Sequence, residues 1–367
     1  MLPADFNLEK RYFFSRLCDM EKDFYVFLLE NLLKNQRKMF FLADKRWWPE
    51  CEKHPELECF EYGKYENWFD IDIQKVYRYI IWDCPELYYV AYDDLSLGLD
   101  AIISIGADTP TYTDDEICEI NKLLYGILHN FDHITDPFEL ELEVHDYIVR
   151  SFDYSDTYEQ GTEHEEREFQ EIFTPVGLIK TGRAVCYGIS RLAQFIFQRR
   201  GLEVANVLAD AGSPDNKCGH AWLAIKLGGN WYHLDVTYNE SSSTDIDIPQ
   251  YCYFNVTDED VRDTHFHSLD EECPDIVCNS TEYNYYHKMG LYFTEPEQIT
   301  EKITHILKEN GDKHRFLYIR VSPELNEATV SSALADGFLK MGYSTEDCLY
   351  LQSNGYFALE LFPKNKK

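Results

Sequence analysis

A thiol, an imidazole and a carboxylate occur in that order between residues 186 and 235 of this chain, as Cys186, His220 and Asp235. A thiol becomes a strong nucleophile when a neighbouring base removes its proton, and the base works best when a third group fixes its ring. Enzymes that transfer acyl groups or hydrolyse amides use such a trio of side chains. The pattern therefore predicts cysteine chemistry on an acyl group, provided that the fold brings the three side chains together.

The thiol is expected at the beginning of a helix, because apolar residues recur at helical spacing after Cys186 and Gly201 can end the helix. These apolar residues are Ile189, Leu192, Ala193, Ile196 and Phe197. A helix N-terminus favours a thiolate through its free N–H groups and its dipole. Gly182 and Gly188 permit the tight turn and the close backbone approach that this arrangement needs. Taken alone, a cysteine in this position is more often a buried structural residue.

The base and the carboxylate are expected on one β-hairpin. Residues 220–227 and 231–236 have strand patterns and are joined by a Gly-Gly pair, which is typical of a two-residue hairpin turn. Closure at that turn aligns the apolar residues on one face, and a slip by one residue would split them between two faces. The predicted opposed pairs are Leu227 with Asn230, Ile225 with Tyr232, Leu223 with Leu234 and Ala221 with Val236.

On the other face of this hairpin, His220 lies diagonal to Asp235. Diagonal neighbours are about 7–8 Å apart at Cα, which allows a contact between these side chains. His233 shares the face and is a rival base, but it precedes the aspartate instead of facing it. A lone histidine on a strand is more often structural, and a lone aspartate at a strand end more often caps a turn. The joint occurrence of all three side chains favours a catalytic triad.

At this point the chain resembles the transglutaminase-like superfamily, whose papain-related fold packs a cysteine helix on a sheet that carries histidine and aspartate. The matching segments are Gly182-x-Ala184-x-Cys186-x-Gly188-x-Ser190, His220-Ala221-Trp222 and Trp231-Tyr232-x-Leu234-Asp235-x-Thr237-Tyr238. The resemblance implies that Cys186 is the nucleophile, His220 the general base and Asp235 the orienting group. Segments upstream and downstream, at 83–90, 145–149, 253–258 and 284–286, resemble bacterial transglutaminase-domain proteins in particular.

Two departures from the family pattern affect the surroundings of the triad. Leu223 stands where many relatives have asparagine, and Tyr238 stands where tryptophan is common. Substrate preference therefore cannot be inherited from the family. Tyr187, Trp222 and Tyr238 are the candidate substrate-binding residues. The backbone N–H of Cys186 is one expected oxyanion donor, and the second donor is not placed.

The expected fold class is α+β: a papain/transglutaminase-like core flanked by a helix-rich N-terminal α/β region and a small C-terminal α/β unit. The predicted domains are 1–113, 114–292 and 293–367. In the first, helices are expected within 8–42 and at 71–82, and strands within 86–106. Two helices are expected within 114–150. In the last, helices are expected at 294–311 and 324–341, and strands at 316–321, 347–352 and 356–362.

The chain is strongly acidic, with 34 Lys and Arg against 66 Asp and Glu and a formal net charge of −32. This charge repels nucleic acids and anionic membranes, so neither is an expected partner. It would favour basic or amine-bearing protein or peptide substrates, although an acidic surface alone needs no functional reason. No apolar run is long enough to span a bilayer. The first residues lack a signal-peptide pattern and the eleven cysteines lack paired spacing, so a cytoplasmic location is expected.

Two further segments have alternative interpretations. Cys252, His265, His267, Cys273 and Cys278 could hold zinc, but structural zinc sites use tighter cysteine pairs, so no metal and no cofactor are expected. The acidic run 159–171 is typical of a solvated loop or a frayed helix, and its place before Cys186 also suits a lid.

Three functions are consistent with the sequence. The first is a cysteine hydrolase of peptide or isopeptide bonds that acts through a thioester. The second is a transglutaminase-type acyl transferase, in which an amine resolves the thioester. The third is a catalytically idle binding domain, which the retention of all three chemical groups disfavours.

Overall fold

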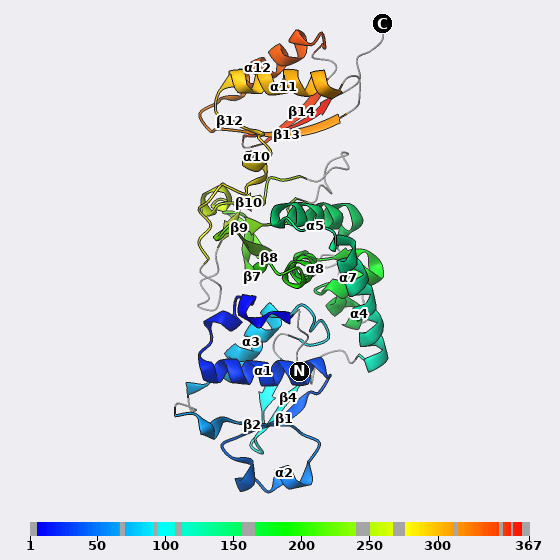
Figure 1. Ribbon diagram of the computed structural model, residues 1–367, viewed down its shortest axis with the longest axis vertical. Coiled ribbons are helices and arrows are strands. Elements are labelled where there is room, and N and C mark those ends of the chain that lie inside the picture. The colour runs from blue at the N-terminus through cyan, green and yellow to red at the C-terminus, as the bar shows by residue number, and fades with distance from the viewer. Residues whose placement is uncertain are drawn as a thin grey trace.

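In the described part of the chain, three β-sheets of four or five strands follow one another along the molecule in chain order and define an N-terminal, a central and a C-terminal tier (Figure 1). The predicted α+β class is confirmed, because helices are mixed with largely antiparallel sheets. The protein is known here from a computed structural model, which describes residues 6–66, 70–91, 94–106, 112–155, 166–239, 250–266, 276–310, 315–344, 348–353 and 355–361. One cluster of buried apolar side chains contains residues from all three tiers.

The N-terminal tier contains a four-stranded sheet in the order β2-β1-β4-β3, in which β1 and β2 are parallel and the other pairs antiparallel. Its strands are β1 (Lys38–Leu42), β2 (Cys59–Glu61), β3 (Leu95–Leu97) and β4 (Ile102–Ile105). Its helices are α1 (Asp19–Leu33), α2 (Glu50–Lys53) and α3 (Ile73–Asp83), with 3-10 turns η2 (Leu8–Lys10), η3 (Phe14–Arg16), η4 (Lys45–Trp47) and η5 (Tyr62–Lys64).

Two expectations for this tier were wrong in part. The helical pattern predicted within 8–42 holds for α1 but not for residues 38–42, which form the strand β1. Short apolar runs do not distinguish a buried strand from a helix, and here pairing with β2 and β4 decides the outcome. Within 86–106, residues 86–90 form hydrogen-bonded turns and not a strand. Their apolar side chains are nevertheless buried, so the run of apolar residues correctly indicated burial but not a strand.

The central tier contains a five-stranded antiparallel sheet in the order β10-β9-β8-β7-β11. These strands are β7 (Glu203–Ser213), β8 (Asn216–Leu227), β9 (Asn230–Leu234), β10 (Phe254–Val256) and β11 (His265–Phe266), and a separate parallel pair joins β5 (Asp153–Tyr154) to β6 (Arg183–Ala184). The helices are α4 (Asp114–Leu128), η7 (His129–Phe131), α5 (Pro137–Ser151), α6 (Glu166–Glu171), α7 (Pro175–Thr181), α8 (Cys186–Arg199), α9 (Asp258–Val261) and α10 (Tyr285–Lys288). The two helices expected within 114–150 are thus present as α4 and α5.

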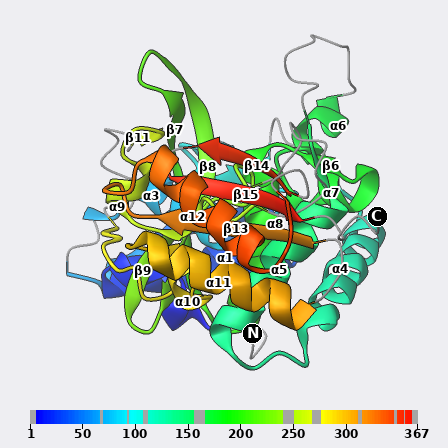
Figure 2. The same cartoon turned by 90° about the horizontal axis from the view of Figure 1, so that it is seen from above.

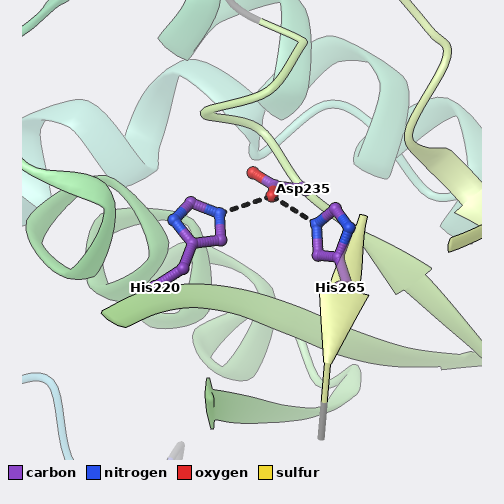
Figure 3. A group of neighbouring side chains, drawn as sticks. All are labelled: His220, Asp235 and His265. Carbon is purple, nitrogen blue, oxygen red and sulfur yellow. Dashed lines mark hydrogen bonds and ion pairs between the residues drawn. The ribbon is translucent and has the colours of Figure 1, made fainter. Parts of the chain in front are cut away.

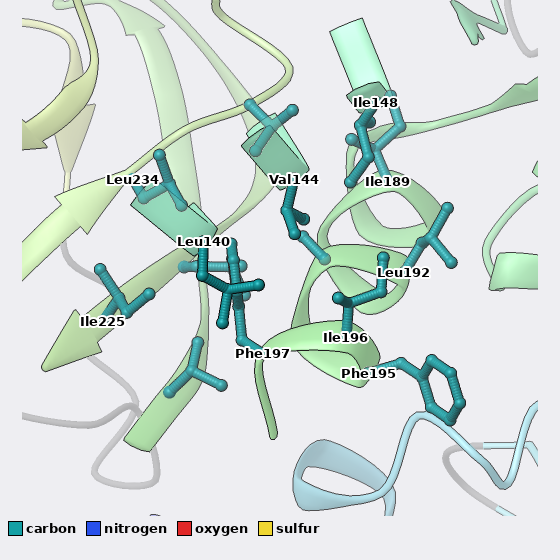
Figure 4. Close-up of a cluster of buried hydrophobic side chains, with 14 of the residues drawn as sticks. Leu140, Val144, Ile148, Ile189, Leu192, Phe195, Ile196, Phe197, Ile225 and Leu234 are labelled. Atoms are coloured by element: carbon teal, nitrogen blue, oxygen red, sulfur yellow. The ribbon is translucent and has the colours of Figure 1, made fainter. Parts of the chain in front are cut away.

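Helix α8 lies in the middle of this tier, packed between the sheet and α5 (Figures 1 and 4). The apolar side chains that predicted the helix are buried, and Figure 4 shows them meeting side chains from α5, β8 and β9. The helix ends where Gly201 was expected to end it: Gly201 is left-handed at φ 82°, and the Leu202 N–H donates to the Phe197 carbonyl at 2.9 Å. This terminus satisfies carbonyl groups that the helix leaves without partners. The thiol at the other end is therefore carried by a rigid, buried element.

The C-terminal tier contains a four-stranded sheet in the order β12-β13-β15-β14, covered on one face by two helices (Figures 1 and 2). The strands are β12 (Tyr292–Phe293), β13 (Arg315–Val321), β14 (Cys348–Ser353) and β15 (Tyr356–Leu361), and the helices are α11 (Pro296–Asn310) and α12 (Glu327–Lys340). The elements expected after residue 293 are present. The domain boundaries proposed from the sequence stay a prediction. Among the described residues no helix is both long enough and apolar enough to cross a membrane.

Candidate active site

Cys186 is the first residue of α8, as the sequence predicted. Val185 before it is extended, at φ −84° and ψ 174°, so the helix begins abruptly at the cysteine. The preceding helix α7 ends at Gly182, whose left-handed φ of 74° lets the chain turn towards β6. The amide N–H of Cys186 belongs to the helix N-terminus, where N–H groups have no acceptor within the helix. The Cys186 side chain therefore lies at the end of the helix where backbone N–H groups are available to an anionic group.

Gly188 fixes where this N-terminus lies. A Cβ atom on Gly188 would meet the Ile172 carbonyl oxygen at 2.5 Å, the Ala184 Cβ at 2.8 Å and the Thr174 carbonyl oxygen at 2.9 Å. Two of these three atoms belong to backbone, which cannot rotate away. The close approach predicted from the glycine is therefore present between the first turn of α8 and the chain around α7.

The hairpin has the predicted register in the part that is strand. Leu223 faces Leu234, Ile225 faces Tyr232 and Leu227 faces Asn230. Strand β9 ends at Leu234 and does not continue to residue 236 as expected. The Asp235 N–H instead donates to the Tyr253 carbonyl at 3.0 Å, beside β10. Asp235 therefore lies one residue beyond the strand, where its side chain still reaches His220.

The structure brings the three predicted side chains together. His220 Nε2 lies 2.6 Å from Asp235 Oδ2 (Figure 3). Cys186 is also near enough to His220 to interact with it and to contribute to the raised pKa of that imidazole. Since Nε2 is directed to the carboxylate, Nδ1 is the ring nitrogen left for the thiol. The imidazole thus lies between the sulfur and the carboxylate, which is the order that a thiol, a base and an orienting group require.

The charges of this site support one another. Burial alone would lower the pKa of His220, but the charge and the hydrogen bond of Asp235, with a contribution from Cys186, raise that pKa to about 10. The imidazole is therefore an imidazolium at neutral pH when these partners surround it. Burial would raise the pKa of Asp235, yet His220 and His265 hold it well below its usual range. Asp235 consequently stays ionised although its side chain is only 2% exposed.

Asp235 has two more donors that the hairpin pattern did not predict. His265 Nε2 lies 2.9 Å from the same Oδ2 atom (Figure 3). The Tyr238 N–H donates to Oδ1 at 3.0 Å. His265 lies on β11, which pairs with β7 and places it opposite Ala211. In the sequence His265 was only a member of the possible zinc set. Nothing in its local spacing indicates the contact, because the pairing of β11 with β7 creates it.

The candidate substrate-binding residues differ in their surroundings. Trp222 is 1% exposed, and its Nε1–H donates to His233 Nδ1 at 3.0 Å, so it packs beside the site as part of the core. Tyr238 is half-buried, and its ring stacks on His220 with 4.9 Å between centroids. Tyr187 is also half-buried and its hydroxyl accepts from Arg191 at 2.8 Å. Tyr187 lines an apolar cavity of about 270 Å³ between the N-terminal and central tiers.

His233, the rival base, is engaged elsewhere. Its Nδ1 accepts from the Trp222 indole, which can only donate, so its Nε2 carries the proton that points to Asp258 at 2.8 Å. Both ring nitrogens thus have partners other than Cys186 and Asp235. The geometry favours His220 as the base.

The possible zinc set does not converge in the described part of the chain. Cys252 lies beside the Tyr286 hydroxyl, His265 at Asp235, and Cys278 near Asp258. His267 and Cys273 lie outside the described residues, as do residues 159–165 of the acidic run. The remainder of that run forms α6, where the Glu171 carboxylate accepts from Lys180 and Arg167.

Comparison with known proteins gives a family for the central tier. Residues 128–236 match the model of the transglutaminase-like superfamily. No curated protein matches the sequence. Among solved structures, a proposed cysteine protease from Cytophaga hutchinsonii is 20% identical over 33% of this chain and 38% of its own, with a TM-score of 0.25. A TGase is 13% identical over 41% and 46%, with a TM-score of 0.30. Menin is 12% identical over 63% and 43%, with a TM-score of 0.25.

The chain spans less than half the length of each of these solved structures. The family match alone defines the class: residues 128–236 form a transglutaminase-like core. The resemblance predicted from the motifs is thereby confirmed. The matched range contains Cys186, His220 and Asp235 and ends before His265.

Proposed function

We propose that this chain is a cysteine hydrolase of amide bonds, acting on peptide or isopeptide linkages through a thioester. The observation that carries the proposal is the alignment of His220 between Cys186, at the N-terminus of a buried helix, and the ionised Asp235. This geometry supplies a nucleophile, a proton carrier and an orienting group in contact. The transglutaminase-like class of the core supports the same choice.

The reaction has two half-reactions. Cys186 Sγ, deprotonated by His220, attacks the amide carbonyl carbon, and the oxyanion that forms is stabilised by N–H donors such as that of Cys186. When the C–N bond breaks, His220 gives its proton to the leaving amine and a thioester remains. Water then attacks the thioester while His220 takes one of its protons. Collapse of this second intermediate releases the carboxylic acid, and the proton on His220 returns to the Cys186 sulfur.

An acyl transferase would differ only in the second half-reaction, where an amine would replace water. Such an enzyme needs a water-shielded channel for the amine. Trp222, one of the aromatic residues that could line it, is buried in the core with its N–H bonded to His233. Water is therefore the acceptor we expect. The net charge of −32 favours substrates with basic groups, such as lysine-containing peptides.

The test incubates the full chain with peptides that contain glutamine, or a glutamyl-lysine isopeptide, together with a fluorescent primary amine. Cleavage or deamidation without incorporation of the amine supports hydrolysis, and incorporation supports transfer. The variant Cys186→Ala should lose either activity. Cys118→Ala, at an exposed cysteine on α4, is the matched control and should keep it. Full activity of Cys186→Ala would refute the proposal, and a thiol inert to all acyl donors and reagents would favour a binding domain.

A further inference from the structure

The carboxylate that orients His220 is itself held by a second histidine. Asp235 Oδ2 contacts His220 Nε2 at 2.6 Å on one side and His265 Nε2 at 2.9 Å on the other. Figure 3 shows the two rings on opposite sides of the carboxylate, one from β8 and one from β11. The His265 side chain is 1% exposed. A buried carboxylate is costly unless its lone pairs are satisfied, so this second ring has an energetic role at Asp235.

The far side of the His265 ring is also occupied. His265 Nδ1 lies 2.9 Å from Thr264 Oγ1, and that hydroxyl lies within hydrogen-bonding distance of the Val261 carbonyl at 3.2 Å. If the hydroxyl proton turns to His265 Nδ1, the ring is neutral and its proton is on Nε2. If it turns to Val261, Nδ1 carries a second proton and donates to the hydroxyl. Because the ionised Asp235 carboxylate can only accept, the contact at 2.9 Å is a hydrogen bond when His265 Nε2 carries a proton, and both arrangements at Thr264 are compatible with that.

His265 is fixed by aromatic packing as well as by hydrogen bonds. Its ring centroid lies 4.8 Å from that of Trp222, 5.0 Å from Tyr238 and 5.2 Å from Tyr253. Tyr238 in turn stacks on His220. The second histidine is therefore part of the same packed group as the base, and it has little freedom to leave the carboxylate.

We propose that His265 is a positioning residue of the active site: its Nε2–H holds Asp235 in the orientation that keeps His220 aligned with Cys186. The inference rests on the proposed cysteine chemistry and extends it by one side chain. His265 does not contact the sulfur or the substrate carbonyl in this role, and it acts through Asp235. The site is then a chain of hydrogen bonds that begins at Cys186 and passes through His220, Asp235 and His265 to Thr264.

The arrangement favours positioning over metal binding. His220, Asp235 and His265 are close enough to share a metal ion. However, both Nε2 atoms are directed at one carboxylate oxygen as donors, and His220 would have to leave Cys186 or Asp235 to bind a cation through either nitrogen. The titratable groups of the described chain that interact electrostatically with Asp235 are His220, His265, Tyr238, Tyr253 and His145.

The experiment compares His265→Met with His265→Gln in the full chain. Both side chains are similar in size to histidine, but only glutamine has an N–H that can donate to Asp235. The probe is iodoacetamide, and the rate of modification of Cys186 is followed by peptide mass spectrometry between pH 4 and 9. We expect His265→Met to react about tenfold more slowly at pH 6 and its acid limb to move up by about one pH unit, because a poorly held imidazolium stabilises a thiolate less. His265→Gln should stay within about threefold of the wild-type rate.

His233→Met is the matched control. His233 is equally buried, lies on the same face of the hairpin and makes two hydrogen bonds, to Trp222 and Asp258. Its substitution should lower the melting temperature but leave the rate and pH profile of Cys186 modification unchanged. Suppose that His220→Ala slows the modification of Cys186 but His265→Met keeps the wild-type rate and pH profile. That result would refute the positioning role of His265 and leave the proposed function standing. If Cys186 instead reacts at the same rate in His220→Ala as in the wild-type protein, the proposed function is refuted.

A second measurement keeps the inference testable if His265→Met does not fold. Nitrogen-15 NMR of the histidine-labelled wild-type protein reports which ring nitrogen carries a proton. We expect His265 to be protonated at Nε2 across neutral pH, and its Nε2–H signal to shift in Asp235→Asn. A neutral His265 protonated only at Nδ1 would show that it donates nothing to Asp235 and would overturn the inference.

Discussion

Asp235 is the residue on which the geometry of the site depends. It accepts hydrogen bonds from His220, His265 and the Tyr238 backbone, and it remains ionised although it is buried. The contact with His220 could be predicted from the hairpin, since a two-residue turn and one apolar face determine which side chains are neighbours. The contact with His265 could not be predicted. It depends on a two-residue strand whose pairing with β7 no local pattern indicates.

Replacing this carboxylate by an amide tests its role as the orienting group. Asp235→Asn should keep the fold. In the wild type, Asp235 Oδ2 accepts from both histidines, whereas an NH₂ group in the same place donates and cannot accept. In a serine protease with a Ser-His-Asp triad, the equivalent change lowers kcat about 10⁴-fold. A thiol depends less on its base, so we expect a loss on the order of 10–10³-fold in turnover, with Cys186→Ala and His220→Ala far worse. A folded variant with unchanged turnover would mean that His220 is oriented by another group.

A buried carboxyl behind the site gives a prediction about pH. Glu141 on α5 is fully buried, and Asn255 Nδ2 donates to its Oε2 at 2.7 Å. Burial raises the pKa of Glu141 from 4.5 to about 8, and only Asn255 opposes this. Because the folded-state pKa is raised, the stabilising contribution of this group is complete below pH 4.5 and is lost as the pH rises to about 8.

Glu141→Gln should therefore remove part of the pH dependence of stability. The amide cannot ionise and keeps an oxygen for Asn255, so at pH 8.5 the variant should be more stable than the wild type by about 2 kcal/mol or more. Near pH 4 the two proteins should differ by less than about 1 kcal/mol. Urea unfolding at both pH values measures this. A wild-type advantage at pH 8.5 would show that the Glu141 charge is stabilised in the folded protein.

At the scale of elements, the position of α8 decides whether the thiol meets the base. Its apolar residues and its glycine terminus predicted the helix correctly, because period, length and cap all agree. Gly188 then sets how close the first turn lies to the chain around α7. From the sequence, Gly188 indicated that the backbone must approach another segment closely at this position. Which atoms approach could only be seen in the fold.

Gly188→Ala should displace the first turn of α8. The added methyl would lie within 3 Å of two backbone carbonyl oxygens, so we expect a loss of about 1–3 kcal/mol in the free energy of unfolding and slower alkylation of Cys186. Gly126→Ala is the matched control, because Gly126 is an exposed residue of α4 with nothing within 4 Å of its Cβ position. That substitution should stabilise the protein by about 0.5–1 kcal/mol and leave Cys186 unchanged. Equal effects at both positions would refute the close contact.

At the scale of the whole molecule, a buried arginine joins the N-terminal tier to the core. The Arg11 guanidinium contacts the Asp83 carbonyl, the Glu86 carboxylate and the Gln198 side chain near the end of α8, and Arg11 is 1% exposed. The tiers could be anticipated from the sequence as successive groups of helices and strands. The contacts between the tiers could not be anticipated, because they are made by single polar residues whose partners lie far away in the sequence.

Arg11→Met should destabilise the molecule by about 3 kcal/mol, since it leaves buried acceptors without their cation. Arg199 also pairs with Glu86, at 2.8 Å, and should limit the loss. Arg46→Met is the control, because Arg46 pairs with Asp44 at the surface and its side chain is 81% exposed. No measurable change in stability is expected there, since exposed ion pairs contribute little. Calorimetric unfolding of both variants provides the comparison. Similar melting temperatures for the two would show that Arg11 does not stabilise the joint.

Selective alkylation of Cys186 is the most direct test of the account as a whole. The wild-type protein is treated with limiting iodoacetamide at pH 6, and peptide mass spectrometry reports which of the eleven cysteines has reacted. Cys18, Cys118 and Cys218 are exposed, whereas Cys186 is only half-exposed, so accessibility alone would favour the other three. We predict that Cys186 reacts first and that His220→Ala abolishes this preference, because a neighbouring imidazole makes a cysteine a stronger nucleophile. Faster modification of the exposed cysteines, with no effect of His220→Ala, would contradict the assignment of Cys186 as the nucleophile.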